Sequence, residues 1–336
     1  MTSPAVSYRT FVIANPTAAA GAVEDDWPLI ERLLQANLSE LDYAFTQGPG
    51  HATLLTREAL RAGWEMIVSV GGDGTLNEVI NGFFEPPQPR ERFERTDDGW
   101  VVGRDVGPEP INEEAVLGHL PHGTGGDFRR TLGLMGGIAE AVEHLRGRHT
   151  RTIDVGEIGY IDHHDQLASR YFINIACAGI SGLVDHYVNS SWKGLGGTTS
   201  FVWGTFRAFL RWTNAELEVR LDGTTELRDR ILNLVAANGE YFGAGMWIAP
   251  GAEVDDGAFQ VVVMGDLSKP EMVTILPRIY RGSHVGSDKV KRYRASEVSA
   301  KPVETDEPVL LDVDGEQPGR LPTLWRVHPS AIRFKV

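Results

Sequence analysis

A glycine-rich turn between a buried strand and an amphipathic helix constrains this chain more than any other segment. Residues 66–83 read MIVSVGGDGTLNEVINGF, where a short apolar run precedes the turn and apolar residues recur at helical spacing after it. Gly71, Gly72 and Gly74 allow positive φ and the close approach of a ligand, and the first N–H groups of a helix attract anions. The segment therefore predicts a phosphate site. The alternative is a tight turn in which Asp73 caps the helix.

The order of elements predicts two domains in a chain of 336 residues. The first part alternates strands and helices, which is typical of an α/β domain with a parallel sheet. From about residue 150, short strands separated by turns predict a β-rich, mostly antiparallel domain. We expect the boundaries 1–148 and 149–336, with a polar surface insertion at about 85–114. The last strands could return to the first domain, and the active site is expected in a cleft between the two domains.

Composition excludes several classes of function. The formal net charge of −14 argues against a nucleic-acid binder, since such proteins rely on cationic contacts with phosphates. Cys177 is the only cysteine, so we expect a reducing compartment and no zinc site. No segment approaches the roughly 20 apolar residues that span a bilayer. We expect a cytoplasmic protein, at most peripheral at the inner face of a membrane, and leave a homo-oligomer open.

Other turns in the sequence are similarly placed after a strand or before a helix. Asn15-Pro16-Thr17 follows the first strand and Thr46 follows the second, and each is either a structural turn or a nucleotide contact. The turn at 123–127, Gly-Thr-Gly-Gly-Asp, again places glycines and a hydroxyl at a helix start. Arg129 and Arg130 follow it as phosphate contacts or as solvated surface arginines. The sequence contains neither GxxxxGK[ST] nor a Rossmann GxGxxG, so both of those nucleotide sites are excluded.

Acidic residues cluster near the C-terminus in VLLDVDGEQP. Asp312, Asp314 and Glu316 alternate, so they share one face if the strand continues. Clustered carboxylates repel one another, and one of them could have a raised pKa suited to accepting a hydroxyl proton. The alternative is an acidic surface hairpin of the Asp-Gly type.

A second acidic turn, GAEVDDGAF at 251–259, carries Glu253, Asp255 and Asp256. These carboxylates and the neighbouring carbonyls form a hard-oxygen set suited to Mg²⁺ or Ca²⁺. An Asp-Gly hairpin again competes with that interpretation.

Two segments bear on the substrate. Residues 201–212, FVWGTFRAFLRW, place aromatic side chains at helical spacing, which fits a lipid-accepting cleft, a membrane contact or ordinary core packing. Residues 278–294 hold six Arg or Lys against one acid, Asp288. This segment either attracts anionic lipid head groups or is a solvated loop.

In this order, Asn-Pro-Thr, GGDGTLNEVINGF, PxGTGxDFxR, NGEYFGAGMWIAPGAEVDDGAF and DVDGE resemble the diacylglycerol kinase catalytic family, which includes bacterial lipid kinases and sphingosine and ceramide kinases. The resemblance runs from about Phe11 to Val336. The GGDGT turn alone is shared with NAD kinases, whereas its combination with GTGxDF and the terminal DGE is more specific to lipid kinases. The family implies an N-terminal α/β nucleotide domain and a β-rich C-terminal domain with the active site in the cleft.

The resemblance implies roles for individual residues. Glu316 would be the general base that deprotonates the lipid hydroxyl, supported by Asp314, with Asp73 as a third catalytic residue. Mg²⁺ would be held by Glu253, Asp256 and Ala258. The expected ATP contacts are Asn15, Pro16, Thr17, Thr46, Gly71, Gly72, Asp73, Gly74, Thr75, Leu76, Asn77, Gly123 and Thr124.

The sequence departs from the family at two places. Gly126 replaces the Asn of GTGNDFAR, Arg129 replaces its Ala, and the insertion at 85–114 is longer than expected.

From the resemblance as a whole, we expect an ATP-dependent kinase that transfers the γ-phosphoryl group to a lipid hydroxyl, that of diacylglycerol. The alternatives are a kinase of a sphingoid base, a soluble NAD kinase-like enzyme, and a non-catalytic lipid- or nucleotide-binding regulator.

Overall fold

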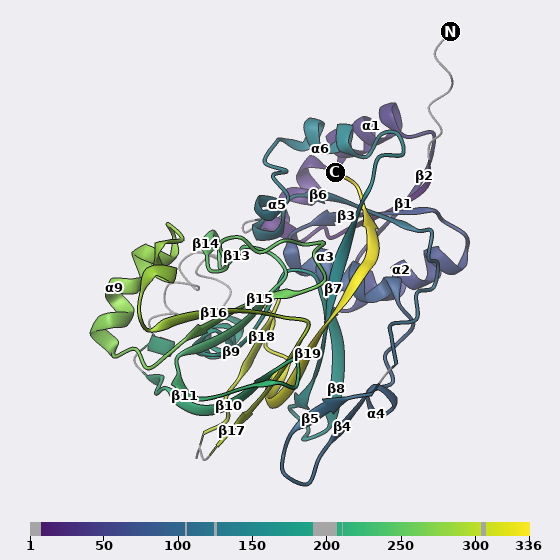
Figure 1. Ribbon diagram of the computed structural model, residues 1–336. Coiled ribbons are helices and arrows are strands. Elements are labelled where there is room, and N and C mark those ends of the chain that lie inside the picture. Colours follow the sequence, from purple (N-terminus) through teal and green to yellow (C-terminus); the bar gives the residue numbers. More distant parts are fainter. Residues whose placement is uncertain (1–7, 105, 124–125, 191–206, 210, 304–306) are drawn as a thin grey trace. The chain divides into compact units, whose positions relative to one another are not determined.

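The chain divides into two compact units. The computed structural model describes residues 8–104, 106–123, 126–190, 207–209, 211–303 and 307–336. The first unit comprises Met1–Pro87, Pro108–Val155 and Pro329–Val336, and the second comprises Gln88–Gly107 and Gly156–His328. Each unit is described by itself (Figure 1). Among the described residues, no helix has the length and apolar character that a membrane span requires.

A parallel sheet forms the centre of the first unit. Its strand order is β6-β3-β1-β2, and the end of β19 pairs with β6 in parallel through Arg333 and Phe334. Every residue of the central strand β3 is buried, whereas the edge strand β2 is mostly exposed, so the apolar run at 66–70 occupies the position that its composition predicts. The strands are β1 (Arg9–Ala14), β2 (Glu40–Phe45), β3 (Met66–Gly71) and β6 (Val116–Pro121).

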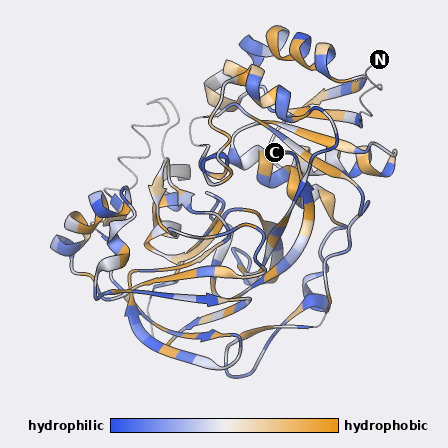
Figure 2. Ribbon diagram, turned by 45° about the horizontal axis from the view of Figure 1, so that its top comes forward, coloured by the Kyte–Doolittle hydropathy of each residue, from blue (hydrophilic) through white to orange (hydrophobic). Residues whose placement is uncertain are grey.

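Helices cover both faces of this sheet. Helices α1 and α6 pack on one face and α2 and α3 on the other (Figure 1). Buried residues of α1 and α6, such as Trp27, Leu34 and Val142, share a core with Val12 and Val68 of the strands. Hydrophobic and hydrophilic residues alternate along these helices (Figure 2), as expected for helices that cover a sheet. The helices are α1 (Ala22–Asn37), α2 (His51–Arg61), α3 (Asp73–Phe83), α5 (Asp127–Thr131) and α6 (Ile138–His144), with a 3₁₀ turn at Ala18–Gly21.

The second unit is β-rich. One group of strands pairs in the order β11-β10-β17-β19, with β7 pairing β19 and β8, and another has the order β16-β15-β12-β9-β18. The strands are β7 (Arg151–Asp162), β8 (Leu167–Phe172), β9 (Ile175–Gly179), β10 (Ala215–Leu221), β11 (Thr225–Ile231), β12 (Asn233–Ala237), β13 (Tyr241–Phe242), β14 (Met246–Trp247), β15 (Phe259–Met264), β16 (Val290–Ala295), β17 (Glu297–Pro302), β18 (Leu311–Val313) and β19 (Gly319–Phe334).

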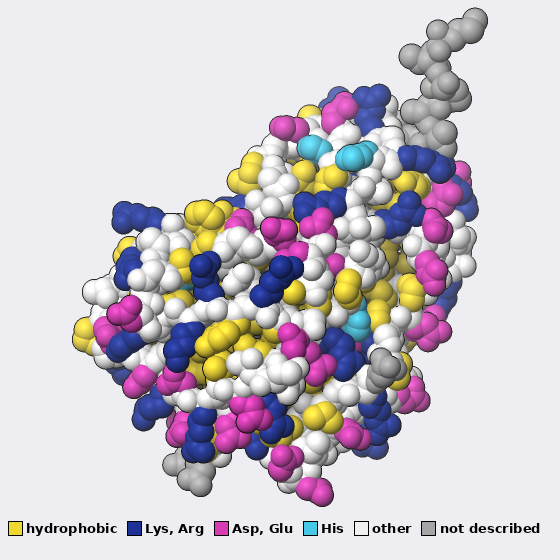
Figure 3. All heavy atoms as spheres, viewed as in Figure 1, with side chains coloured by type: hydrophobic (Ala, Val, Ile, Leu, Met, Phe, Trp, Pro, Cys, Tyr) yellow, Lys and Arg dark blue, Asp and Glu magenta, His cyan; other side chains and the backbone are white. Residues whose placement is uncertain are grey.

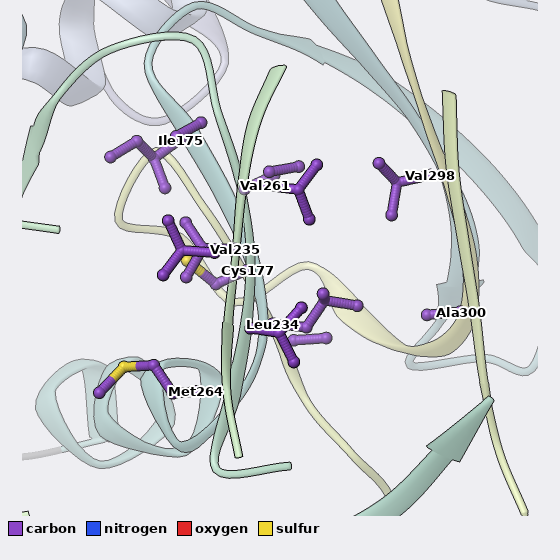
Figure 4. Close-up of a cluster of buried hydrophobic side chains, with 14 of the residues drawn as sticks. Ile175, Cys177, Leu234, Val235, Val261, Met264, Val298 and Ala300 are labelled. Atoms are coloured by element: carbon purple, nitrogen blue, oxygen red, sulfur yellow. The ribbon is translucent and has the colours of Figure 1, made fainter. Parts of the chain in front are cut away.

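A single hydrophobic core joins the two sheets of the second unit. Leu234 and Val261 lie on the side of Val298 and Ala300, while Val235 lies on the opposite side (Figure 4). Side chains that alternate between faces are the pattern of a sheet buried on both sides. The predicted order, α/β with a parallel sheet followed by a β-rich part, is therefore confirmed.

Two longer helices accompany these sheets. They are α7 (Ile180–Ser190) and α9 (Lys269–Ile279), and a 3₁₀ turn follows at Ser283–Gly286. Ser268 and Glu271 form a capping box at the start of α9, with Pro270 in its first turn. Most of the aromatic stretch 201–212 lies outside the described residues. Of its described part, Phe209 and Trp212 pack against the core, which favours the core interpretation for these two.

The segment predicted as a surface insertion is structured and partly buried. It forms α4 (Pro89–Arg92), β4 (Phe93–Arg95) and β5 (Val101–Gly103). Phe93 and Val101 form a small core with Leu324, and the buried Arg92 forms an ion pair with the buried Glu157. The abundance of Pro, Arg and Glu in the sequence concealed these few apolar anchors.

The strand does not continue through the three C-terminal acids, so the condition for their sharing one face is not met. Strand β18 ends at Val313, and Asp314 and Gly315 both have positive φ, so the chain turns. Val313 and Glu316 exchange backbone hydrogen bonds of 2.8 and 3.1 Å across this turn. Because two positive-φ residues close a two-residue hairpin, the Asp-Gly alternative describes the backbone here.

Candidate active site

The glycine turn of the first unit lies at the point where the strand order of its sheet reverses. The chain passes from β1 to β2 on one side and returns to β3 on the other side of β1. In open α/β sheets, ligands bind at the carboxyl ends of strands at such a point. Asn15 follows β1, Thr46 follows β2, Gly72 follows β3 and Gly123 follows β6. The sheet therefore gathers the predicted ATP contacts at one edge.

Gly71 and Gly72 start helix α3 without an ordinary side-chain cap. Gly71 has φ +156°, and a Cβ there would lie 2.6 Å from Oγ1 of Thr75. Gly72 is the N-cap residue, and no side chain caps α3 among the described residues. The first N–H groups of this eleven-residue helix are thus available to an anion.

The second glycine turn touches the first, backbone against backbone. A Cβ on Gly123 would lie 2.6 Å from the Cα of Gly72, and the N–H of His122 donates to the carbonyl of Gly71 at 2.8 Å. Only residues without side chains allow this approach. The two turns therefore form one surface of main-chain groups. Thr124, predicted to bind ATP, lies outside the described residues.

Asn15 connects the turn after β1 to helix α3. Its Nδ2 donates to Oγ1 of Thr75 at 3.2 Å, and its Oδ1 accepts from the N–H and hydroxyl of Thr17 at 3.1 and 2.9 Å. Pro16 lies between these two residues. The N–H of Thr46 donates to the carbonyl of Ala14, so the residue that follows β2 is still hydrogen-bonded to the end of β1. The sequence left these residues open between turn and ligand contact, and the geometry brings them to one edge.

Asp73 binds the start of helix α5, which follows the second glycine turn. Its carboxylate accepts from the N–H groups of Asp127 and Phe128 at 3.1 and 3.4 Å. Gly126, which precedes them, has φ +63°. Asn is the residue other than Gly that most readily adopts this conformation, so both Gly126 and the family's Asn are compatible with it. Arg130 pairs with Asp127 at 2.8 Å.

The side chains of Leu76 and Asn77 are less accessible to a ligand than the other predicted ATP contacts are. Both side chains are fully buried. Oδ1 of Asn77 accepts from Nδ2 of Asn81 at 3.3 Å within the same helix. Gly74 differs from its neighbours in the turn, because a Cβ there would meet no atom within 4 Å.

The Asp-Gly turn of the second unit is held by the Asp314 carboxylate. This group accepts three backbone N–H groups, from Ile173 at 2.9 Å, Asn174 at 3.1 Å and Ile175 at 2.9 Å. Three converging amides fix a carboxylate firmly. Asp314 therefore anchors the turn that carries Glu316.

Glu316 is half-exposed and paired with a partly buried arginine. Its Oε2 accepts from Nη1 of Arg170 at 2.6 Å. Burial opposes the charge of Arg170, but the attraction of Glu316 outweighs it and the pKa of Arg170 is raised. No local pattern pointed to Arg170, because it lies in strand β8, 146 positions away from Glu316.

Two more carboxyl groups lie behind this turn. Asp312 of β18 and Asp185 of α7 share a hydrogen bond, and burial raises the pKa of Asp312 to about 6. Burial, followed by the charge of Asp312, raises the pKa of Asp185 well above its ordinary value. Two neighbouring carboxyls out of water retain a proton between them. Only Asp312 was singled out in the sequence.

In the acidic turn at 251–259, the expected metal ligands are not all available to a metal ion. Oδ2 of Asp256 pairs with Arg294 at 2.7 Å, and Oδ1 accepts the N–H of Ala258 at 3.0 Å. Glu253 is exposed. Within the described ranges, no group of three or more His, Cys, Asp or Glu residues could hold a metal ion. The residues present thus do not fit a preformed Mg²⁺ site, and the ligand set stays a prediction.

A buried histidine in the first unit also escaped the sequence interpretation. His119 of β6 lies beside a cavity of about 10 Å³, which has room for about one water molecule. Burial lowers the pKa of His119 to about 4, so the ring is neutral near pH 7. Its Nδ1 lies 3.3 Å from the carbonyl of Ser69. This cavity is too small for a nucleotide.

Two family models match consecutive parts of the chain. The diacylglycerol kinase catalytic domain matches residues 9–158, and the YegS C-terminal NAD kinase beta sandwich-like domain matches residues 174–336. The diacylglycerol kinase of Staphylococcus carnosus (strain TM300) is 28% identical over 94% of this chain and 90% of its own. That of Staphylococcus haemolyticus (strain JCSC1435) is 28% identical over 93% of this chain and 83% of its own.

A solved structure shares the whole fold. The crystal structure of a diacylglycerol kinase from Bacillus anthracis str. Sterne has a TM-score of 0.66 and 19% identity, covering 99% of this chain and 98% of that one. The fold class is thus that of a diacylglycerol kinase structure. The match over residues 9–158 identifies a diacylglycerol kinase catalytic domain, which together with the matching C-terminal domain makes this chain a lipid kinase, and a kinase domain implies the use of ATP.

Proposed function

We propose that this protein transfers the γ-phosphoryl group of ATP to the free hydroxyl of diacylglycerol, giving phosphatidic acid and ADP. The names of the relatives support the acceptor. The observation that carries the phosphoryl chemistry is the contact between Gly123 and Gly72, because it gathers main-chain N–H groups that no described side chain caps. Such preorganised donors stabilise phosphate charge without a lysine-bearing loop.

The proposed reaction divides between the two units. In the first unit, the start of α3 holds the phosphates, Asn15 and Thr17 line the same edge, and Asp73 keeps the two glycine turns together. In the second unit, Glu316 accepts the proton of the lipid hydroxyl. The hydroxyl oxygen bonds to the γ-phosphorus, the bond from that phosphorus to the bridging oxygen breaks, and ADP leaves.

Arg170 and Asp314 act through Glu316 in this proposal. Arg170 engages Oε2, so we assign proton acceptance to Oε1. Asp314 fixes the turn through the amides of residues 173–175. Both are positioning residues, since neither touches the reacting atoms in the proposal.

The acceptor and the base are tested together. Purified protein with labelled ATP and Mg²⁺ should phosphorylate micellar diacylglycerol in preference to a sphingoid base or NAD. Glu316→Gln should retain near-normal ATP affinity and lose on the order of 10²-fold or more in kcat, as expected for a missing general base. Unchanged turnover removes Glu316 from the mechanism, and ATP binding without turnover on any lipid favours a regulator.

Gly74→Ala tests the phosphate site independently of the base. The fold accommodates a methyl group at this position. A loss of ATP affinity of roughly tenfold or more without a loss of thermal stability would then report the close approach of a phosphate. If ATP affinity is unaffected, the phosphates do not lie against this turn.

A further inference from the structure

Helix α9 is apolar on both of its faces. Met272, Ile275 and Ile279 are buried against the core of the second unit. On the outer face, Val273 is 60% exposed, Leu276 41% and Tyr280 49%. A surface helix ordinarily places polar residues on its outer side. The exposed stripe therefore has no explanation in the packing of the described residues of this unit.

The charges around the stripe are cationic. From Met272 to Ser287 the sequence contains no Asp or Glu, although the chain has 46 acidic residues among 336. Arg278 and Arg281 lie within this stretch, and the Arg278 side chain donates to the carbonyl of Ser283. Glu271, the nearest acid in the helix, is occupied by the capping box and by Lys289 at 2.8 Å. At the left edge of the molecule, where α9 lies, Figure 3 shows hydrophobic side chains next to Lys or Arg, with some Asp or Glu among them.

The other cations of residues 278–294 are largely neutralised. Lys291 pairs with Asp229 at 3.1 Å and Arg294 with Asp256 at 2.7 Å. No ion pair is recorded within the described residues for Arg278, Arg281 or Arg292. The sequence analysis considered the whole segment as one cationic patch; in the structure, the cations next to the exposed stripe are Arg278 and Arg281, at the end of α9.

We propose that the outer face of α9 docks on an anionic bilayer, with Val273, Leu276 and Tyr280 at the level of the head groups and the adjacent arginines against lipid phosphates. An apolar stripe beside cations, with a tyrosine at its edge, suits an interface that is apolar on one side and anionic on the other. A protein with a net charge of −14 approaches such a surface only through a locally positive face. The choice of a bilayer over a protein partner rests on the proposed lipid acceptor.

Vesicle sedimentation tests the proposal without nucleotide. The wild type should bind vesicles of equal parts phosphatidylglycerol and phosphatidylcholine at least about tenfold more tightly than phosphatidylcholine alone, and added salt should weaken that binding. Val273→Asp/Leu276→Asp should reduce binding by about tenfold or more, and Arg281→Glu by a few-fold at low salt. Met135→Asp, at a 56% exposed position of the first unit, is the matched control and should bind as the wild type does.

A second variant and a second readout keep the outcomes distinct. Val273→Ser/Leu276→Ser removes the stripe without adding charge and should lose binding at an unchanged thermal midpoint. Phosphorylation of a dispersed short-chain diacylglycerol should be unchanged in these variants, while phosphorylation of vesicle-borne diacylglycerol falls. If the α9 variants bind vesicles like the wild type, or abolish a dimer instead, docking is overturned. If vesicles bind but no lipid is phosphorylated, the proposed function fails and docking stands.

Discussion

The turns of the two units use glycine and aspartate in opposite ways. In the first unit, Gly72 and Gly123 make the contact and leave N–H groups available at the start of α3. In the second unit, the Asp314 carboxylate consumes three N–H groups and thereby fixes the turn that carries Glu316. One turn offers donors to a ligand, and the other uses donors to hold an acid. A short Gly-Asp-Gly or Asp-Gly motif therefore does not reveal its role by composition alone.

The largest expected effect is at Asp314. Asp314→Ala leaves three backbone donors without their acceptor, so we expect the free energy of unfolding to fall by about 3 kcal/mol or more. Asp73→Ala removes two longer hydrogen bonds of 3.1 and 3.4 Å and should cost about 1 kcal/mol. Urea denaturation of both variants measures the difference. Equal losses would contradict the contrast between the two turns.

A smaller effect distinguishes two glycines of the first unit. Gly123→Ala places a Cβ 2.6 Å from the Cα of Gly72, a backbone atom that cannot rotate away, and should destabilise the protein by about 1–3 kcal/mol. Gly74→Ala meets nothing within 4 Å and should be neutral or stabilise helix α3 by up to about 1 kcal/mol. Thermal unfolding of the pair is the measurement. A tolerated Gly123→Ala would mean that the two turns do not depend on their contact.

The sequence predicted the elements of the first unit well, because local patterns determine them. The apolar run and the helical spacing in residues 66–83 predicted a strand and a helix where the structure has β3 (Met66–Gly71) and α3 (Asp73–Phe83). It predicted individual site residues less well in the second unit, where partners are far apart in the chain. Arg170 and Asp185 carry no local signal, and their relation to Glu316 and Asp312 appears only once the sheets assemble. Long-range pairing, rather than propensity, decides the surroundings of an acid.

The carboxyl pair behind the Glu316 turn gives a pH-dependent prediction. The pKa of Asp312 is about 6 in the folded protein and near its ordinary 3.8 when unfolded, so the folded state holds the proton more tightly. The associated stability is fully present below pH 3.8 and is lost as pH rises through about 6. Asp312→Asn should remove this dependence. The free energy of unfolding of the variant, relative to that of the wild type, should therefore be roughly 1–3 kcal/mol higher at pH 8 than at pH 5. Denaturation at both pH values measures this difference.

Asp288→Asn, at an exposed position, is the control for this experiment. A parallel pH profile for wild type and Asp312→Asn would contradict the shared proton.

The smallest expected effect concerns the second acidic turn. Arg294 is exposed, so breaking its ion pair with Asp256 by Arg294→Met should change stability by less than about 1 kcal/mol. The same substitution frees Oδ2 of Asp256, beside the Ala258 N–H and near Glu253 in sequence. Mg²⁺ alone should therefore leave the thermal midpoint of the nucleotide-free wild type unchanged and raise that of Arg294→Met slightly, because metal and arginine compete for one carboxylate. If Mg²⁺ raises the wild-type midpoint and Asp256→Asn abolishes that rise, the turn binds the ion despite Arg294. In that case the acidic turns of the second unit, like the glycine turns of the first, would be built for a ligand.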